Sequence, residues 1–165
     1  MKCTRGLEKV GERRFKKIEV GGPAINFDYA HFLPSSPKCG VLHGHTSMVN
    51  VAVVGEVVDD MVVEFSQLKQ TVKKVIDEMD HKLIVASKYI VETSDGSYRI
   101  VFKGVGGVYD LRVPKNSVYV IERDSTVENI SEHITSRIRE RMPPNVYKVV
   151  VRMTEGLGKS ATSSV

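Results

Sequence analysis

The sequence predicts an α+β fold in which two helices pack on one face of an antiparallel sheet. Two segments carry apolar residues at a helical period, and runs of β-forming residues precede, separate and follow them. Glycine and aspartate turns between several of these runs favour hairpins, and therefore antiparallel pairing. A length of 165 residues predicts a single domain that spans residues 1–165.

Strands are expected before the first helix. The expected strands and extended pieces are residues 15–20, 24–32, 45–58 and 61–65. Gly21, Gly22 and Pro23 separate the first two of these segments. Residues 33–40 contain two prolines and a glycine, so they predict a loop.

Two helices are expected, over residues 66–79 and 127–141. Each has apolar residues on one face at a 3.6-residue period, with charged residues on the other face. Ser66 is a candidate N-cap for the first helix, and Ser125 with Glu128 fits a capping box for the second. Pro143 and Pro144 end the second helix.

The region between the helices, residues 84–121, is expected to be rich in strands. Asp95-Gly96 predicts a hairpin, and the glycines at 104, 106 and 107 predict a second turn. Residues 147–154 predict a last strand after the second helix. Residues 156–165 are polar and are expected to form a mobile tail.

Composition excludes several classes of function. The net charge is +4, from 24 basic and 20 acidic residues, and no basic stripe interleaved with aromatics points to nucleic acid. This mild excess suits a small anionic ligand. No apolar run approaches the length of a membrane span, and Met1 to Phe15 has no apolar secretory core, so we expect a cytoplasmic location. A reducing compartment favours free thiols at Cys3 and Cys39.

His43-Gly44-His45 is the first candidate for a metal site. Residues i and i+2 of a strand point to one face, so both imidazoles can approach one ion, and Gly44 removes bulk between them. His31, on the preceding extended segment, can supply a third nitrogen. Three nitrogen ligands leave a tetrahedral zinc ion with one open position, which is typical of a catalytic site. Taken alone, the motif could also be a polar turn.

Three further polar groups have two interpretations each. Cys39 could be a fourth ligand of a closed zinc site, or a nucleophile or base whose thiolate is stabilised by Zn²⁺ or Lys38. Asp80-His81 could simply end a helix, or serve as a proton shuttle in which the carboxylate orients the imidazole. Glu155 could be solvated, or could accept two N–H groups from a guanidine-like ring edge.

An ordered set of motifs carries a family resemblance. The motifs are Phe27-Asp28-Tyr29-Ala30-His31, CGVLHGH from Cys39 to His45, MVVEF from Met61 to Phe65 with Leu68-Lys69, Asp80-His81, STVEN from Ser125 to Asn129, and Thr154-Glu155. Together they resemble the 6-pyruvoyltetrahydropterin synthase and 6-carboxytetrahydropterin synthase family. Any one motif is weak evidence, but the ordered set is highly specific.

The resemblance implies a tunnelling fold, a homo-oligomer (a trimer, or a hexamer of two stacked trimers) and the substrate 7,8-dihydroneopterin triphosphate. It implies zinc held by His31, His43 and His45; a catalytic thiol on Cys39 with Asp80 and His81 as its relay, often from a neighbouring subunit; and pterin contacts from Glu155 and Thr126. Acid–base steps would expel triphosphate.

The family has two main branches with different products. One keeps the side chain as 6-pyruvoyltetrahydropterin, and the other cleaves it to 6-carboxytetrahydropterin and acetaldehyde on the way to 7-deazaguanine (queuosine-type) nucleosides. Three residues separate Cys39 from His43, a short spacing that favours the carboxy branch. The alternatives are the pyruvoyl enzyme, a related enzyme that forms 6-hydroxymethylpterin, and a non-catalytic pterin-binding zinc protein.

Two features depart from the family pattern. Glu64 stands where the family commonly has Asp before Phe65, and both residues are acidic. Residues 88–117 are longer than the corresponding family segment and form a β-rich insertion with an extra hairpin, which could lie at a subunit edge or cover the mouth of the site.

Overall fold

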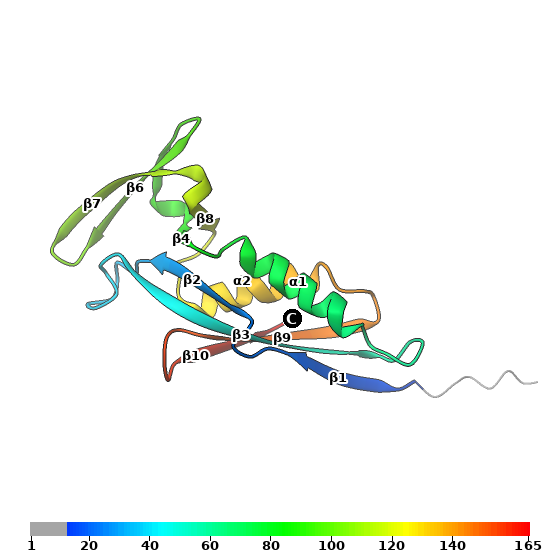
Figure 1. Cartoon of the computed structure of the whole chain (residues 1–165). Coiled ribbons are helices and arrows are strands. Elements are labelled where there is room, and N and C mark those ends of the chain that lie inside the picture. Colours follow the sequence, from blue (N-terminus) through cyan, green and yellow to red (C-terminus); the bar gives the residue numbers. More distant parts are fainter. Residues whose placement is uncertain (1–12) are drawn as a thin grey trace, which may run out of the picture.

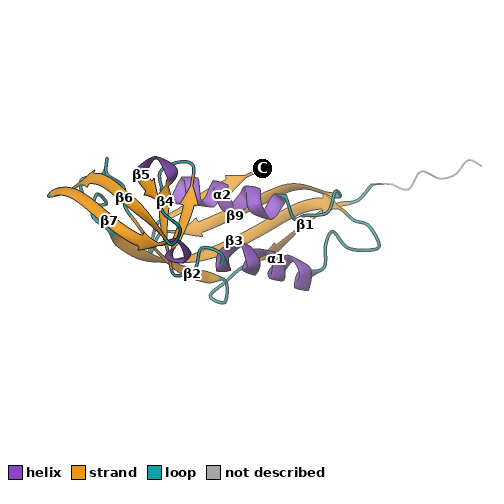
Figure 2. Ribbon diagram, turned by 90° about the horizontal axis from the view of Figure 1, so that it is seen from above, coloured by secondary structure: helices purple, strands orange, loops and turns teal. Residues whose placement is uncertain are grey.

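The structure is a computed structural model that describes residues 13–165; residues 1–12, with Cys3, lie outside the described part. Two helices lie side by side on one face of a seven-stranded sheet, and a three-stranded sheet projects from one end (Figures 1 and 2). The large sheet comprises β1 (Phe15–Val20), β2 (Asn26–His31), β3 (His43–Glu56), β4 (Lys82–Ala86), β8 (Val118–Ile121), β9 (Val146–Thr154) and β10 (Ser160–Ser164). The α+β class is confirmed.

Strand β3 organises the large sheet because three other strands pair with it. Its first part, His43–Met48, pairs antiparallel with β2. Its second part pairs with β1 on one side and with β9 on the other. The 14 residues of β3 therefore connect the end of the sheet that carries the histidines with the end that covers the core.

The sheet is mixed, whereas antiparallel pairing throughout was expected. Strand β4 runs parallel to β2, with Tyr29 opposite Lys82, and β8 runs parallel to β4, with Leu83 opposite Val118. The cause is the chain path, because a helix connects β3 to β4 and an entire small sheet connects β4 to β8. Long crossover connections of this kind return strands in parallel, and local turn signals cannot reveal them.

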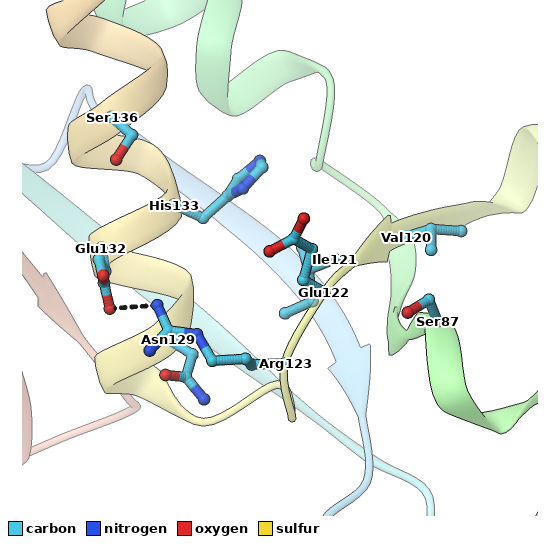
Figure 3. Close-up of a pocket in the computed structure, with 9 residues that line it drawn as sticks. All are labelled: Ser87, Val120, Ile121, Glu122, Arg123, Asn129, Glu132, His133 and Ser136. Carbon is cyan, nitrogen blue, oxygen red and sulfur yellow. Dashed lines mark ion pairs between the residues drawn. The ribbon is translucent and has the colours of Figure 1, made fainter.

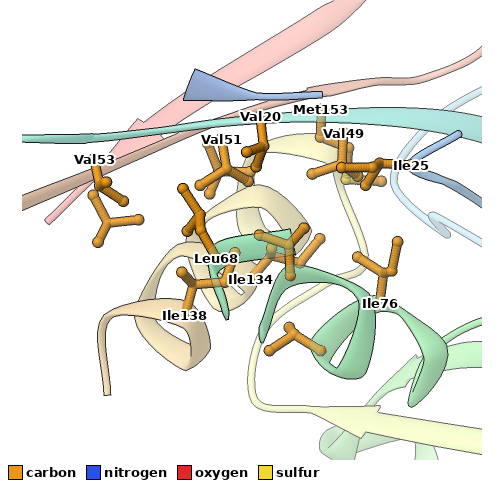
Figure 4. Packing of buried hydrophobic residues seen from close by; sticks show 14 of the residues in the cluster. Val20, Ile25, Val49, Val51, Val53, Leu68, Ile76, Ile134, Ile138 and Met153 are labelled. Carbon is orange, nitrogen blue, oxygen red and sulfur yellow. The ribbon is translucent and has the colours of Figure 1, made fainter. Parts of the chain in front are cut away.

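The two helices, α1 (Phe65–Asp77) and α2 (Val127–Arg139), cover the main core. Their buried faces are those predicted from the apolar period, and both helices pack against β-strand side chains of the large sheet (Figure 4). The core residues labelled there include Val49, Val51 and Val53 of β3, Leu68 of α1 and Ile134 of α2. Burial of each such side chain contributes about 1.5–3 kcal/mol.

In both helices the N-cap residue is not the expected serine but a residue close to it in the sequence. Glu64 is the N-cap residue of α1, and Ser66 lies inside the helix and donates a hydrogen bond to the Glu64 carboxylate. Thr126 is the N-cap residue of α2, where its hydroxyl accepts a hydrogen bond from Asn129 N–H. The preceding Ser125 instead donates its hydroxyl to the Phe32 carbonyl. The capping chemistry was right for α2, but its position was wrong by one residue.

The C-terminal segment is a strand, so the expectation of a mobile tail was wrong. Strand β10 pairs antiparallel with β9 along its whole length, and Val165 exchanges two backbone hydrogen bonds with Val149. The Ser163 hydroxyl also lies 2.7 Å from that of Ser131 on α2. Strand β10 consists of small polar residues and carries no hydrophobic pattern, so only its pairing with β9 identifies it as a strand.

The three-stranded sheet forms where the turn signals predicted strands. It comprises β5 (Ile90–Thr93), β6 (Ser97–Gly104) and β7 (Gly107–Pro114), with single-turn 3-10 helices η1 (Ser87–Tyr89) and η2 (Lys115–Ser117) on either side. Phe102 of β6 and Phe32, which follows β2, belong to a second apolar cluster between this sheet and the large one. Within residues 13–165, no helix has both the length and the apolar character needed to cross a membrane.

Replacement of Ile134 by Ala should lower the free energy of unfolding by about 2–5 kcal/mol, because the side chain is fully buried and its loss leaves a cavity. Urea unfolding monitored by circular dichroism would measure the change. Ser136→Ala, at an exposed position of the same helix, is the matched control and should change the value by less than about 0.5 kcal/mol. Equal effects of the two substitutions would contradict the assigned packing face of α2.

Candidate active site

The pairing register of β2 and β3 brings the three histidines together. His31 lies directly opposite His43, and Tyr29 lies opposite His45. The Nε2 atoms of His31 and His43 are 3.1 Å apart, and one ring nitrogen from each of the three histidines lies within 4.8 Å of the others. Alternation along β3 puts His43 and His45 on one face, as the sequence predicted.

Backbone carbonyls orient two of these rings. His31 Nδ1 lies 2.6 Å from the Ser125 carbonyl, and His43 Nδ1 lies 2.9 Å from the Val41 carbonyl. A carbonyl only accepts hydrogen bonds, so each Nδ1 carries the proton and each Nε2 presents a lone pair. Two lone pairs 3.1 Å apart repel one another unless a cation lies between them. Zinc–nitrogen bonds of about 2.0–2.1 Å put two tetrahedral ligands about 3.3 Å apart, so the donor set fits zinc.

The environment favours the neutral imidazole at two of the three histidines, His31 and His45. Burial lowers the pKa of His31 from 6.5 to about 4, against the opposing effects of the Ser125 carbonyl and Glu155. Burial also lowers the pKa of His45, while the Glu155 carboxylate raises it. Neutral imidazole is the form that binds metal ions, so the lowered pKa values of His31 and His45 favour metal binding.

Glu155 lies beside the histidines at the turn between β9 and β10. One carboxylate oxygen is 3.9 Å from His31 Nε2, and the other is 3.4 Å from Lys159 Nζ. The side chain is only 13% exposed, so the solvated interpretation of this residue is wrong. Gly156 has a φ of +65°, which L-residues with a side chain rarely adopt, and it packs near the His45 ring.

Tyr29 is a candidate that the sequence analysis missed. It is buried on the same face of β2 as His31, and its ring centroid lies 5.2 Å from that of His31 and 6.0 Å from that of His45. Its hydroxyl is buried and has no hydrogen-bonding partner among the described residues. Its i, i+2 relation to His31 on the expected strand was the signal that could have identified it.

Cys39 is half-buried in the loop between β2 and β3, and its thiol is free. The group of nitrogens that lie within 4.8 Å of one another does not include Cys39 Sγ. The described residues therefore offer no closed four-ligand site with this cysteine. Cys39 makes hydrogen bonds through its backbone, to the Ser36 hydroxyl and to Leu33 N–H.

Asp80 and His81 lie on the other face of the β2–β3 ribbon. His81 Nδ1 lies 2.9 Å from Asp80 Oδ1, which also accepts a hydrogen bond from Asp28 N–H. Burial would raise the pKa of Asp80, but the hydrogen bonds from Asp28 and His81 lower it below its usual value. His81 and Thr46 line a groove of about 460 Å³ on this face. Among the described residues, Cys39 Sγ has no hydrogen bond to either Asp80 or His81.

A second cavity, of about 370 Å³, lies between β8 and α2 and contains no predicted site residue (Figure 3). An ion pair of 2.6 Å between Arg123 and Glu132 crosses part of it. Thr126 lies at the start of α2, and its hydroxyl accepts a hydrogen bond from Asn129 N–H. The carbonyl of the preceding residue, Ser125, is the one that bonds to His31 Nδ1.

Comparison with known proteins agrees with this geometry. The family model described as 6-pyruvoyl tetrahydropterin synthase matches residues 23–164. The chain belongs to this family. It is therefore a lyase of the pterin synthase type.

Relatives in this family include proteins named for the carboxy reaction. A Methanocaldococcus jannaschii protein assigned as a 6-carboxy-5,6,7,8-tetrahydropterin synthase is 31% identical over 156 residues, which cover 87% of this chain and 93% of the relative. A Pyrococcus horikoshii protein with the same assignment is 33% identical over 133 residues, which cover 78% and 79%. The crystal structure of 6-pyruvoyl tetrahydropterin synthase from Plasmodium vivax has the same fold, with a TM-score of 0.77, 24% identity and coverage of 92% and 98%.

Metal-free protein should lose stability as the pH falls from 7 to 5, because His31 accepts a proton more readily in the unfolded chain than in the fold. The unfolded state binds the extra proton below pH 6.5, and the folded state binds it only near pH 4. The expected loss between pH 7 and pH 5 is about 2 kcal/mol in urea unfolding. His31→Gln should show a shallower dependence, and an unchanged slope would contradict this role of His31.

Proposed function

We propose that this protein is a zinc-dependent lyase that converts 7,8-dihydroneopterin triphosphate to 6-carboxy-5,6,7,8-tetrahydropterin for 7-deazaguanine (queuosine-type) biosynthesis. The observation that carries this proposal is the cluster of three imidazole nitrogens within 4.8 Å of one another, beside the half-buried Glu155. The names of the archaeal relatives and the short spacing between Cys39 and His43 support the carboxy product over the pyruvoyl product.

In this proposal His31, His43 and His45 hold the zinc ion. When bound, zinc polarises a substrate side-chain oxygen and makes the adjacent C–H more acidic. Glu155 accepts two N–H groups from the guanidine-like edge of the pterin ring, a bidentate arrangement that fixes the ring plane. Thr126, at the start of α2, is the second residue that we assign to the pterin site.

Proton transfer is assigned to Cys39, which takes the proton from the substrate side chain. Asp80 and His81 serve as its relay, and their mutual contact of 2.9 Å orients the His81 ring. Because this pair lies on the opposite face of the ribbon from the three histidines, we propose that it serves the site of a neighbouring subunit in a trimer or hexamer.

A second candidate product is a 6-hydroxymethylpterin. A relative from Pyrococcus furiosus, named dihydroneopterin monophosphate aldolase, is 27% identical over 131 residues, which cover 79% of this chain and 84% of that protein. The same zinc site and Glu155 suit both reactions, since each begins with a pterin that carries a hydroxylated side chain. The substrate phosphate and the fate of the side chain distinguish the two.

Product analysis with zinc-loaded protein tests the proposal directly. Incubation with 7,8-dihydroneopterin triphosphate should release acetaldehyde and triphosphate and give 6-carboxytetrahydropterin on chromatography. Retention of the side chain as 6-pyruvoyltetrahydropterin, or formation of a hydroxymethylpterin from the monophosphate, would replace the proposed product by one of the alternatives. No turnover with either substrate would favour a non-catalytic pterin-binding protein.

Cys39→Ala should lower kcat by about 100- to 10,000-fold and leave the zinc content at the parental value, since the proposed role of the thiol is proton transfer and not ligation. Zinc analysis and steady-state kinetics on the same preparation would measure both. Cys3→Ala is the control, with parental activity expected. Loss of zinc from Cys39→Ala would support a structural site in which the cysteine is a ligand.

A further inference from the structure

We propose that the β6–β7 hairpin is the platform that positions the Cys39 loop, residues 32–42, and that Gly104, Phe102 and Tyr109 are positioning residues for the thiol. The inference rests on the proposed catalytic role of Cys39. Figure 1 shows the turn of this hairpin next to the loop between β2 and β3. The two segments are far apart in the sequence; two sets of contacts join them, and a third holds the loop together.

The first contact joins the end of the loop to the tip of the hairpin. The Gly40 carbonyl accepts a hydrogen bond of 3.2 Å from Val105 N–H. Gly104 packs directly below it: a Cβ atom there would lie 2.8 Å from Tyr109 Cε2, 3.1 Å from Phe102 Cε2 and closer still to the Gly40 carbonyl oxygen. Glycine at 104 is required because the two backbones approach so closely.

The second contact joins the start of the loop to the hairpin through stacked rings. Phe32 stacks on Phe102 with centroids 3.6 Å apart and an interplanar angle of 4°. Phe102 stacks in turn on Tyr109, at 4.6 Å and 4°. The Tyr109 hydroxyl donates to the Val105 carbonyl at 3.3 Å, which closes the tip of the hairpin around Gly104.

The third set consists of hydrogen bonds within the loop, which link Cys39 to the other loop residues. Leu33 N–H donates to the Cys39 carbonyl at 2.7 Å, and Gly40 N–H donates to the Ser36 carbonyl at 2.9 Å. Cys39 N–H donates to the Ser36 hydroxyl at 3.1 Å. Because Cys39 lies between these bonds, a displacement of Gly40 or Phe32 moves the thiol as well.

The hairpin therefore contacts the loop at Phe32 and at Gly40, whereas the zinc-binding histidines lie on the two strands that flank the loop, and the Val41 carbonyl joins the loop to His43. The three histidines are on β2 and β3, and Glu155 follows β9. A disturbance at Gly104 should consequently change the reaction rate more than substrate binding. A misplacement of a reacting group by about 1 Å costs on the order of 100-fold in rate.

Gly104→Ala tests the platform, with Gly96→Ala as the matched control in the turn just before the same strand, where an added Cβ meets nothing within 4 Å. Both are made in a Cys3→Ser background, so that Cys39 is the remaining thiol. Gly104→Ala should lower kcat on the order of 100-fold and change KM by less than about threefold. Its zinc content should equal that of the parent, and iodoacetamide should alkylate Cys39 faster. Gly96→Ala should match the parent in all four.

Parental kcat and alkylation rate in Gly104→Ala would overturn the proposal, and so would a loss of kcat that follows a loss of zinc. If Gly104→Ala does not fold, Tyr109→Leu decides, because it removes one stacked ring and the Val105 contact without adding bulk; the same split between kcat and KM is expected. Absence of turnover in the parent would reject the proposed function. The alkylation rates would still test whether the hairpin positions the loop, since they need no substrate.

Discussion

The antiparallel register between β2 and β3 determines where the three candidate metal-binding histidines lie. With His31 opposite His43, three imidazoles share the face that also buries Phe27 and Val49. A slip by one residue would move every side chain of the shifted strand to the other face, and with it both the core residues and the histidines. The register is therefore fixed by burial of the apolar core, and the metal-binding geometry results from the same constraint.

The two faces of this ribbon carry different chemistry. The core-side face presents the buried His31 and the half-buried His43 and His45, and the pKa values of His31 and His45 are lowered, which suits a metal ion. The opposite face presents the Asp80–His81 pair, which is hydrogen-bonded to the backbone of Asp28 and lies beside an open groove. Under the proposed function, one chain holds the metal-binding histidines and the Asp80–His81 relay on different faces of the ribbon, which is the reason for the proposal that a neighbouring subunit supplies the relay.

Local patterns predicted the parts of the fold that local physics determines. The apolar faces of both helices and the hairpin at Asp95-Gly96 follow from period and turn chemistry, and the structure confirms them. The parallel pairings of β4 depend on partners distant in sequence, whereas β10 pairs with the adjacent β9 but consists of small polar residues without a hydrophobic pattern. Among the site residues, the histidines carried a motif, whereas Tyr29 had only its i, i+2 relation to His31, and the structure adds a buried hydroxyl with no hydrogen-bonding partner in residues 13–165.

The one-residue displacement of the α2 cap matters for the site. The carbonyl of an N-cap residue accepts the first hydrogen bond of its helix, and here the Thr126 carbonyl accepts from Ile130 N–H at 2.9 Å. Had Ser125 been the cap, its own carbonyl would have served the helix. Because the helix begins one residue later, the Ser125 carbonyl is free to accept from His31 Nδ1. The start of α2 thus directs the Nε2 lone pair of the most buried histidine toward the other two rings.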